Sequence, residues 1–384
     1  MRSGHPWVFA DSIKGQNREG VAGELAIMYD RKDRFLAVGF YEPSSPIRIR
    51  VLHTGKPATI DREWWLKAAR AALAKRQPDI INSQTNGARC INGESEGFPG
   101  LVADHYADTL VVKLYSASWL PHWTLIEETL REVFKTRYLV LRLSRNILSQ
   151  ASTEWALAEG FCGETGAEIV PFLENGILFE SAVLNGQKTG FFLDQRDNRA
   201  RVETLSDGRD VLNVFSFSGG FSLYAARGGA SHVTDLDISS HALESAERNF
   251  RLNTTDSRIY NVARDSVQAD AFEWIDEAPK DRTYDLIIVD PPSLAKRERE
   301  RDGAIRAYHR LNACALRRLR PGGVLVAASC SAHIPADDFL ELVRSIAHRS
   351  GRKWHEEWTS EHATDHPAAF REAKYLKAIC LRMD

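Results

Sequence analysis

The sequence predicts an α/β protein in which a doubly wound sheet of seven strands, ending in an antiparallel hairpin, follows two smaller domains. Three observations support this fold class. From residue 211 onward, short runs rich in Val and Ile alternate with helical stretches, which is typical of parallel strands joined by crossover helices. The last two strand-like runs, 353–361 and 376–383, have only a loop between them. The first 60 residues contain short strands broken by turns rich in Asp, Ser and Pro.

The domain boundaries follow from these patterns. We expect a β-rich module at 1–60, a mixed α/β domain at 61–185 and the doubly wound sheet at 186–384. In the first two domains the predicted strands and strand-like runs are 22–29, 35–41, 47–53, 101–117, 138–143 and 168–185, and the predicted helices are 63–77 and 125–134. In the third domain the predicted strands are 211–217, 232–238, 258–265, 284–289 and 324–330, and the predicted helices are 240–253, 303–320 and 336–348.

The composition excludes several classes of protein. A chain of 384 residues with 43% hydrophobic and 27% charged residues is neither disordered nor fibrous. The N-terminal segment has no apolar signal region, and no apolar run approaches the ~20 residues of a membrane span, so we expect a cytoplasmic protein. The five cysteines include no Cys-x-x-Cys pair, and the sequence therefore predicts neither a disulfide framework nor a metal site.

A glycine turn follows the predicted strand at 211–217. Gly219 and Gly220 allow a ligand to approach the backbone, and Asp237 ends the next strand, where a carboxylate can accept hydrogen bonds from ribose hydroxyls. Asp270 follows the third strand and is expected to accept from an adenine amino group. The adjacent glycines do not match Gly-x-Gly-x-x-Gly, the pattern that cradles a pyrophosphate. The sequence therefore favours S-adenosylmethionine, which carries adenosine without phosphate.

Two further strand ends carry reactive groups. Asp290 precedes two prolines that hold its loop extended, and we expect it to orient the ring nitrogen and amino group of a base. Cys330 ends the fifth strand at the same edge of the sheet. A thiolate there can add to carbon 6 of a pyrimidine, which makes carbon 5 nucleophilic toward a methyl donor. The sequence does not identify the base that removes the carbon 5 proton.

Segments spread over nearly the whole chain resemble one family, the large-subunit ribosomal RNA cytosine-C5 methyltransferases I. The resemblance is carried by residues 4–9, 43–48, 97–104, 186–199, 219–220, 290–292, 329–331, 365–367 and 375–377. It implies an N-terminal PUA-like RNA-binding domain, a central domain and a Rossmann-like class I methyltransferase domain that uses S-adenosylmethionine. It also implies ribosomal RNA as the partner, and a homodimer is compatible with it.

The resemblance assigns roles to individual positions. Cys330 is expected to be the nucleophile, and Asp290 is expected to contact both cofactor and base. The other expected cofactor contacts are Phe192, Asp194, Gln195, Arg196, Phe215, Ser216, Gly219, Gly220, Asp237, Ile238 and Asp270. Four cations that follow the Asp290 loop are expected to grip phosphates beside a flipped nucleotide: Lys296, Arg297, Arg299 and Arg301.

Three features depart from the family pattern, and three other interpretations of the function stay open. Asn213 stands where relatives carry Asp, Ser293 follows the two prolines where other residues are frequent, and the first PUA strand is expected to be absent. The alternatives are a methyltransferase of the same fold that acts on guanine, a non-catalytic RNA-binding or ribosome-assembly factor, and a nicotinamide-dependent oxidoreductase. Retention of Asp237, Asp290 and Cys330 argues against a non-catalytic factor, and the adjacent glycines argue against a nicotinamide-dependent oxidoreductase.

Overall fold

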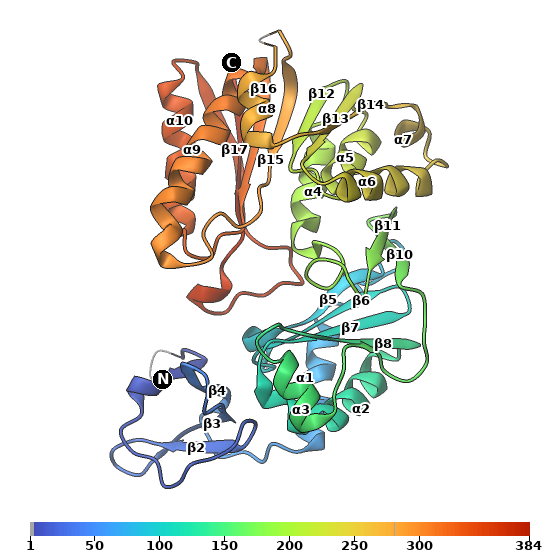
Figure 1. Cartoon of the computed structure of the whole chain (residues 1–384). Coiled ribbons are helices and arrows are strands. Elements are labelled where there is room, and N and C mark those ends of the chain that lie inside the picture. Colours follow the sequence, from blue (N-terminus) through green and yellow to red (C-terminus); the bar gives the residue numbers. More distant parts are fainter. Residues whose placement is uncertain (1–3, 280) are drawn as a thin grey trace. The chain divides into compact units, whose positions relative to one another are not determined.

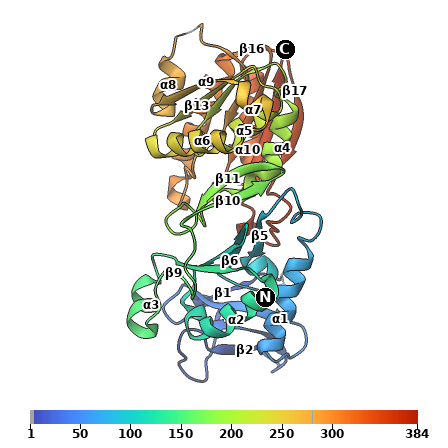
Figure 2. The same cartoon turned by 90° about the vertical axis from the view of Figure 1, so that its right-hand side faces the viewer.

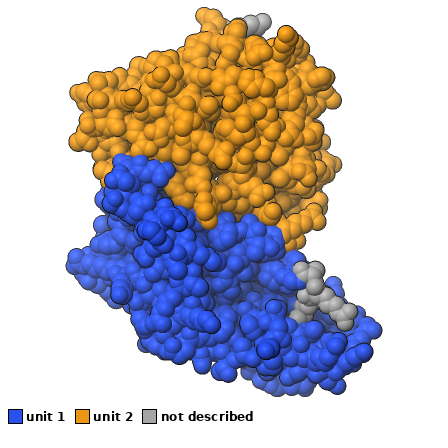
Figure 3. Space-filling view, turned by 180° about the vertical axis from the view of Figure 1, so that it is seen from behind, with its two compact units in different colours: residues 1–176, 181–193, 365–370 blue, residues 177–180, 194–364, 371–384 orange. Residues whose placement is uncertain are grey.

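The computed structural model describes residues 4–279 and 281–384. The chain forms two compact units, coloured separately in Figure 3. Unit 1 comprises residues 1–176, 181–193 and 365–370, and unit 2 comprises residues 177–180, 194–364 and 371–384. Residues 1–3, which open the predicted β-rich module, lie outside the described residues.

Unit 1 begins with a four-stranded antiparallel sheet in the order β1-β4-β3-β2, of which Figure 1 labels β2, β3 and β4. Its strands are β1 (Trp7–Phe9), β2 (Leu25–Tyr29), β3 (Phe35–Tyr41) and β4 (Ile47–Thr54). The last three were predicted, whereas β1 was not. Three residues are too few to show an alternating pattern, so β1 becomes visible only through its pairing with β4.

The rest of unit 1 is a five-stranded sheet with three helices. The sheet order is β5-β6-β7-β8-β9, with β7 and β8 parallel. Its elements are α1 (Arg62–Ala74), β5 (Gly87–Asn92), β6 (Leu101–Tyr106), β7 (Thr109–Leu114), α2 (Trp123–Phe134), β8 (Tyr138–Leu143), α3 (Leu148–Trp155) and β9 (Gly160–Phe161). A two-stranded hairpin follows, formed by β10 (Ile169–Glu174) and β11 (Ile177–Ala182).

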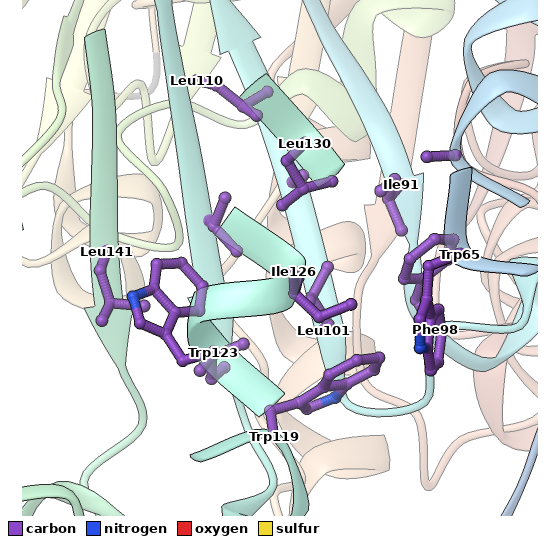
Figure 4. Packing of buried hydrophobic residues seen from close by; sticks show 14 of the residues in the cluster. Trp65, Ile91, Phe98, Leu101, Leu110, Trp119, Trp123, Ile126, Leu130 and Leu141 are labelled. Carbon is purple, nitrogen blue, oxygen red and sulfur yellow. The ribbon is translucent and has the colours of Figure 1, made fainter. Parts of the chain in front are cut away.

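One hydrophobic cluster joins both sheets of unit 1. In Figure 4, Trp123, Ile126 and Leu130 of α2 pack with strand residues of the five-stranded sheet. Phe40 of β3 belongs to the same cluster, with its ring 4.9 Å from that of the fully buried Trp119. The predicted domains 1–60 and 61–185 therefore share a core, and all of their residues except 177–180 fall in unit 1. A boundary near residue 60 stays a prediction.

Unit 2 contains the predicted seven-stranded sheet, in the order β14-β13-β12-β15-β16-β18-β17. Its strands are β12 (Asp210–Val214), β13 (His232–Asp237), β14 (Ala263–Gln268), β15 (Tyr284–Val289), β16 (Leu319–Ser329), β17 (Trp354–Ser360) and β18 (Lys377–Met383). The first five are parallel, and β18 is antiparallel to both β16 and β17. The predicted terminal hairpin is confirmed.

Helices cover both faces of this sheet (Figures 1 and 2). The helices are α4 (Arg196–Thr204), α5 (Gly220–Arg227), α6 (Ser240–Leu252), α7 (Ser257–Asn261), α8 (Ala271–Glu277), α9 (Arg301–Arg317) and α10 (Ala336–Arg349). Ile287 on β15 packs with α8, α9 and α10, while its neighbour Ile288 packs with α4 and α5. Because successive strand residues point to opposite faces, a continuous apolar run is what a sheet covered on both sides requires. Short 3-10 turns lie at Ala10–Ser12, Gly93–Glu96, Ala117–His122, Leu193–Gln195, Glu298–Glu300 and Arg371–Ala373.

Two predicted elements of unit 2 are wrong in part. The predicted strand at 258–265 is instead helix α7 followed by β14, because the Asp256 carboxylate accepts from the backbone N–H groups of Arg258 and Ile259 and caps a helix there. The predicted helix at 303–320 ends at Arg317, before Pro321. Leu319 pairs instead with Tyr284, and the register shifts before Val324 pairs with Leu286, so β16 begins earlier than the apolar run indicates.

Candidate active site

The predicted site residues of unit 2 gather where the strand order reverses. β12 lies between β13 and β15, and the crevice at the carboxyl ends of such strands is the usual ligand site of an open α/β sheet. The backbone after β12 is tightly wound: Phe215 and Gly219 both have positive φ, of 63° and 74°. A Cβ at Gly219 would lie 2.9 Å from the Cβ of Ala246, so the glycine allows α5 to start against α6.

Several N–H groups of the loop after β12 donate to acceptors within the protein. Phe217 N–H donates to Asp237 Oδ2 at 2.9 Å, Ser216 N–H donates to the Leu236 carbonyl at 3.1 Å and Gly219 N–H donates to the Ser216 carbonyl at 2.9 Å. A pyrophosphate cradle needs such groups to be available for the ligand. The loop therefore suits a cofactor without phosphate, which disfavours the nicotinamide reading. Gly220 lies at the start of α5, where a Cβ would come 3.1 Å from Arg199 Cδ.

The end of β13 presents a carboxylate and an exposed apolar side chain. Asp237 Oδ1 also accepts from Ser239 N–H at 2.9 Å, so both oxygens are fixed in position while each retains a further lone pair. Ile238 is 65% exposed, although large aliphatic side chains are mostly buried. An adenosine would satisfy both residues, with its ribose hydroxyls on Asp237 and its base on Ile238.

Asp270 has a second task that the sequence analysis did not anticipate. Its Oδ1 accepts from Phe272 N–H at 2.8 Å and from Glu273 N–H at 3.3 Å, and so caps helix α8. The cap uses one carboxylate oxygen. A contact with an adenine amino group would have to use the other oxygen.

Asp290 is held by an amide chain from helix α4. Gln195 Nε2 donates to Asp290 Oδ2 at 2.9 Å, and Asn198 Nδ2 donates to Gln195 Oε1 at 2.6 Å. Gln195 and Asn198 are buried, so this chain fixes the direction of the Asp290 carboxylate. The structure therefore brings Gln195 and Asp290 together, and their contact with a cofactor or substrate stays a prediction.

The other residues of the 192–196 segment take different positions. Asp194 is buried, accepts from the Tyr375 hydroxyl at 2.7 Å and ties the start of α4 to the C-terminal segment. Arg196 is also buried, and its Nε donates to Asp197 Oδ1 at 3.2 Å. Phe192 belongs to unit 1, where the Lys188 ammonium lies 4.6 Å from the centre of its ring. In unit 2, Phe215 contacts the ring of Phe272 with a centroid distance of 6.1 Å.

Cys330 lies beside the Asp290 loop. Its Sγ is 3.8 Å from the carbonyl oxygen of Pro291, and β15 and β16, which precede these residues, are parallel neighbours. The fully buried Ser331 locks the two loops together, because its Oγ accepts from Leu294 N–H at 3.1 Å and from Ala295 N–H at 3.3 Å. The thiol and the Asp290 carboxylate are therefore presented at one edge by a rigid pair of loops.

Two residues near Cys330 were missed by the sequence analysis. The Tyr308 hydroxyl, on α9, lies 3.0 Å from Ser331 Oγ, and burial raises the pKa of Tyr308 to about 12. The Lys377 ammonium, at the start of β18, donates to the Ser331 carbonyl at 2.6 Å. A lysine at the head of the apolar run 377–383 was the available signal, since lysine is almost never fully buried without a partner.

The four predicted phosphate-binding cations differ in exposure and pairing. Lys296, Arg297 and Arg299 are exposed, whereas Arg301 forms an ion pair with Asp338. Glu300 accepts from the backbone N–H groups of Lys296 and Arg297 at 2.8 and 3.2 Å and shapes the turn that carries them. Three of the four side chains are thus available to an RNA backbone.

Asn213 and Ser293, which depart from the family pattern, point into the protein. Asn213 Nδ2 donates to Ser222 Oγ at 2.8 Å and to Asp235 Oδ1 at 3.4 Å. Burial raises the pKa of Asp235 to about 6, so a second carboxylate at 213 would repel it. Ser293 Oγ donates to the Ala295 carbonyl at 3.2 Å and lies 3.4 Å from Ser331 Oγ.

Within residues 4–279 and 281–384, no helix is long and apolar enough to cross a membrane. In the same part of the chain, no group of three or more His, Cys, Asp or Glu side chains is arranged to hold a metal ion.

The chain is similar to several known proteins. The profile of the S-adenosylmethionine-dependent methyltransferases matches residues 89–379, and that of PUA-like domains matches residues 1–54. A ribosomal RNA large subunit methyltransferase of Deinococcus radiodurans is 56% identical over 100% of this chain and 95% of its own. The ribosomal RNA large subunit methyltransferase I of Aeromonas salmonicida is 35% identical over 98% of this chain and 95% of its own. A solved structure described as a methyltransferase complexed with SAH has the same fold, with a TM-score of 0.84 at 22% identity over 99% of this chain and 96% of that one.

Proposed function

Because the chain belongs to the family of S-adenosylmethionine-dependent methyltransferases that modify large-subunit ribosomal RNA, we propose that it forms 5-methylcytosine in that RNA through a covalent adduct with Cys330. The observation that most supports the proposal is the meeting of two loops at one sheet edge, with Cys330 Sγ 3.8 Å from the carbonyl oxygen of Pro291. A nucleophile and an orienting carboxylate, Asp290, then act on the same base.

The cofactor contacts come from the ends of β12, β13 and β14. Asp237 accepts from the ribose hydroxyls, Ile238 packs on the adenine, and the second oxygen of Asp270 accepts from the adenine amino group. S-adenosylmethionine supplies an electrophilic methyl group on its sulfonium when bound. In this proposal Asp194, Gln195 and Arg196, at the start of α4, line the same cleft, which is the role that the resemblance implies for them.

The chemistry of the Cys330 side chain is nucleophilic catalysis. Its thiolate adds to carbon 6 of the cytosine, so that carbon 5 becomes nucleophilic and takes the methyl group, while the bond between the methyl group and the sulfonium breaks and leaves SAH. A base then removes the carbon 5 proton, the bond between sulfur and carbon 6 breaks, and the thiolate is restored. Asp290 accepts from the cytosine amino group, in an orientation that the 2.9 Å hydrogen bond from Gln195 supports. Lys296, Arg297 and Arg299 bind phosphates beside the flipped nucleotide.

The test is a labelling experiment on large-subunit ribosomal RNA. Wild-type protein with isotopically labelled S-adenosylmethionine is expected to place label in 5-methylcytidine, and Cys330→Ala is expected to abolish it. Cys314→Ala, which alters a buried cysteine of α9, is the matched control and is expected to keep activity. RNA that contains 5-fluorocytidine cannot lose the carbon 5 substituent, so it is expected to trap a covalent complex that depends on Cys330.

The other outcomes separate the remaining readings. Label in a methylguanosine that survives Cys330→Ala would refute both the base and the nucleophile while leaving the cofactor in place. The absence of label in every RNA, together with intact RNA binding, would favour a non-catalytic assembly factor.

A further inference from the structure

A buried lysine contacts the segment that begins at Cys330. Lys377 pairs with Ser329 in the β16–β18 register, and it is 1% exposed. Its Nζ donates to the carbonyl oxygens of Ser331 at 2.6 Å, Ile334 at 2.7 Å and Tyr375 at 3.1 Å. The ammonium therefore holds both ends of the 331–334 segment, immediately after the cysteine.

The three acceptors decide the protonation state of this lysine. A neutral amine has two N–H bonds and cannot donate to three carbonyl oxygens, whereas an ammonium has three. Burial lowers the pKa of Lys377 to about 8, which still leaves the cation dominant at neutral pH. In the part of the chain that the structure describes, no carboxylate forms an ion pair with it. A buried charge without a countercharge is costly, so a nearby anion would stabilise it.

The titratable groups around Lys377 leave one source for that anion. Cys330 is the only ionisable neighbour whose charge raises the pKa of Lys377 in the described residues. Tyr308 stays neutral, because burial raises its pKa to about 12. The Tyr375 hydroxyl donates to Asp194, and His362 Nε2 accepts from Leu376 N–H, so both of these side chains face other partners.

We propose that Lys377 is a positioning residue for Cys330: its ammonium holds the 331–334 segment and stabilises the thiolate form of Cys330. The inference rests on the proposed function, in which Cys330 is the attacking nucleophile. The Asp290 carboxylate at the same edge disfavours the thiolate, and the Lys377 ammonium offsets that repulsion. Because its three protons are all donated to carbonyls, Lys377 is not the missing base.

The test measures the thiol and not the methyl transfer. Full-length protein is alkylated with iodoacetamide between pH 5 and 10, and the rate at Cys330 is followed by peptide mass spectrometry. Lys377→Met is expected to raise the apparent pKa of Cys330 by about one unit or more, hence to lower its alkylation rate at pH 7 about tenfold or more. Lys377→Arg keeps the charge and is expected to retain much of the reactivity.

Two controls lie within the chain. Lys374→Met removes an exposed lysine three residues away, which pairs with Glu361, and is expected to leave the Cys330 profile unchanged. Cys162, whose pKa is raised to about 11 by burial, is a reference thiol that no Lys377 variant should alter.

The alkylation profiles either support or overturn the proposed role of Lys377. Coincident Cys330 profiles for wild type and Lys377→Met would overturn it. If Lys377→Met does not fold, the wild-type protein decides, because an apparent Cys330 pKa at or above the ~8.5 of a free thiol contradicts thiolate stabilisation. The proposed function fails separately: 5-methylcytosine formation by Cys330→Ala would remove the nucleophile while leaving the Lys377 effect on the thiol measurable.

Discussion

Ile238 offers the sharpest test of the cofactor site. It is 65% exposed at the end of β13, and full burial of an isoleucine side chain is worth about 1.5–3 kcal/mol. Covering the exposed part with an adenine is therefore worth about 1–2 kcal/mol, or about a 5- to 30-fold change in Kd. Ile238→Ser is expected to weaken S-adenosylmethionine binding by that factor.

Calorimetric titration with S-adenosylmethionine and with SAH measures the effect without RNA. The substitution should leave stability within about 0.5 kcal/mol of wild type, because the side chain is mostly exposed. Tyr260→Ser is the matched control. Tyr260 is 68% exposed in the same unit, but it lies on α7, which precedes the amino end of β14, whereas the cofactor site lies at the carboxyl ends of the strands. A change below twofold for Ile238→Ser, or an equal loss for Tyr260→Ser, would refute the assignment.

Two further predictions concern titration and RNA affinity. Burial raises the pKa of Asp235 from 3.8 to about 6, so stability present below pH 4 is lost as the pH rises through 6. Between pH 4 and pH 7, the free energy of unfolding of the wild type, measured in urea, should fall by up to about 3 kcal/mol relative to that of Asp235→Asn. Parallel plots of this free energy against pH for the two proteins would contradict the prediction. Replacing Lys296, Arg297 and Arg299 with Ala should reduce the slope of log affinity against log salt by about 2–3. Arg301→Ala, whose side chain pairs with Asp338, should change the slope less, and an unchanged slope in the triple variant would exclude these phosphate contacts.

The elements that the sequence predicts well are those with a strong local pattern. β15 has the predicted bounds, because its apolar run on both faces is unambiguous, and α6 differs from prediction by one residue. Residues 258–265 were misread because Ile259 and Tyr260 favour a strand on composition, whereas the Asp256 cap starts a helix.

In the candidate site, too, the sequence pattern predicts some features and the tertiary structure alone decides others. The sequence places Asp237, Asp290 and Cys330 at strand ends, and successive parallel strands put those ends at one edge. Which groups orient them depends on distant segments, such as Gln195, which is 95 residues from Asp290 in the chain. A one-dimensional pattern contains no signal for such a hydrogen bond.

The sequence by itself determined the parallel strands β12, β13, β15 and β16, the terminal hairpin, the glycine turn and the placement of the candidate residues at strand ends. These properties depend on neighbours within a few positions, so periodicity and motif spacing are enough to find them. Only the tertiary structure decided the environment of the thiol. Tyr308 and Lys377 reach Ser331 from 23 and 46 residues away, and the burial that controls their charge exists only once α9 and β18 have packed against the sheet.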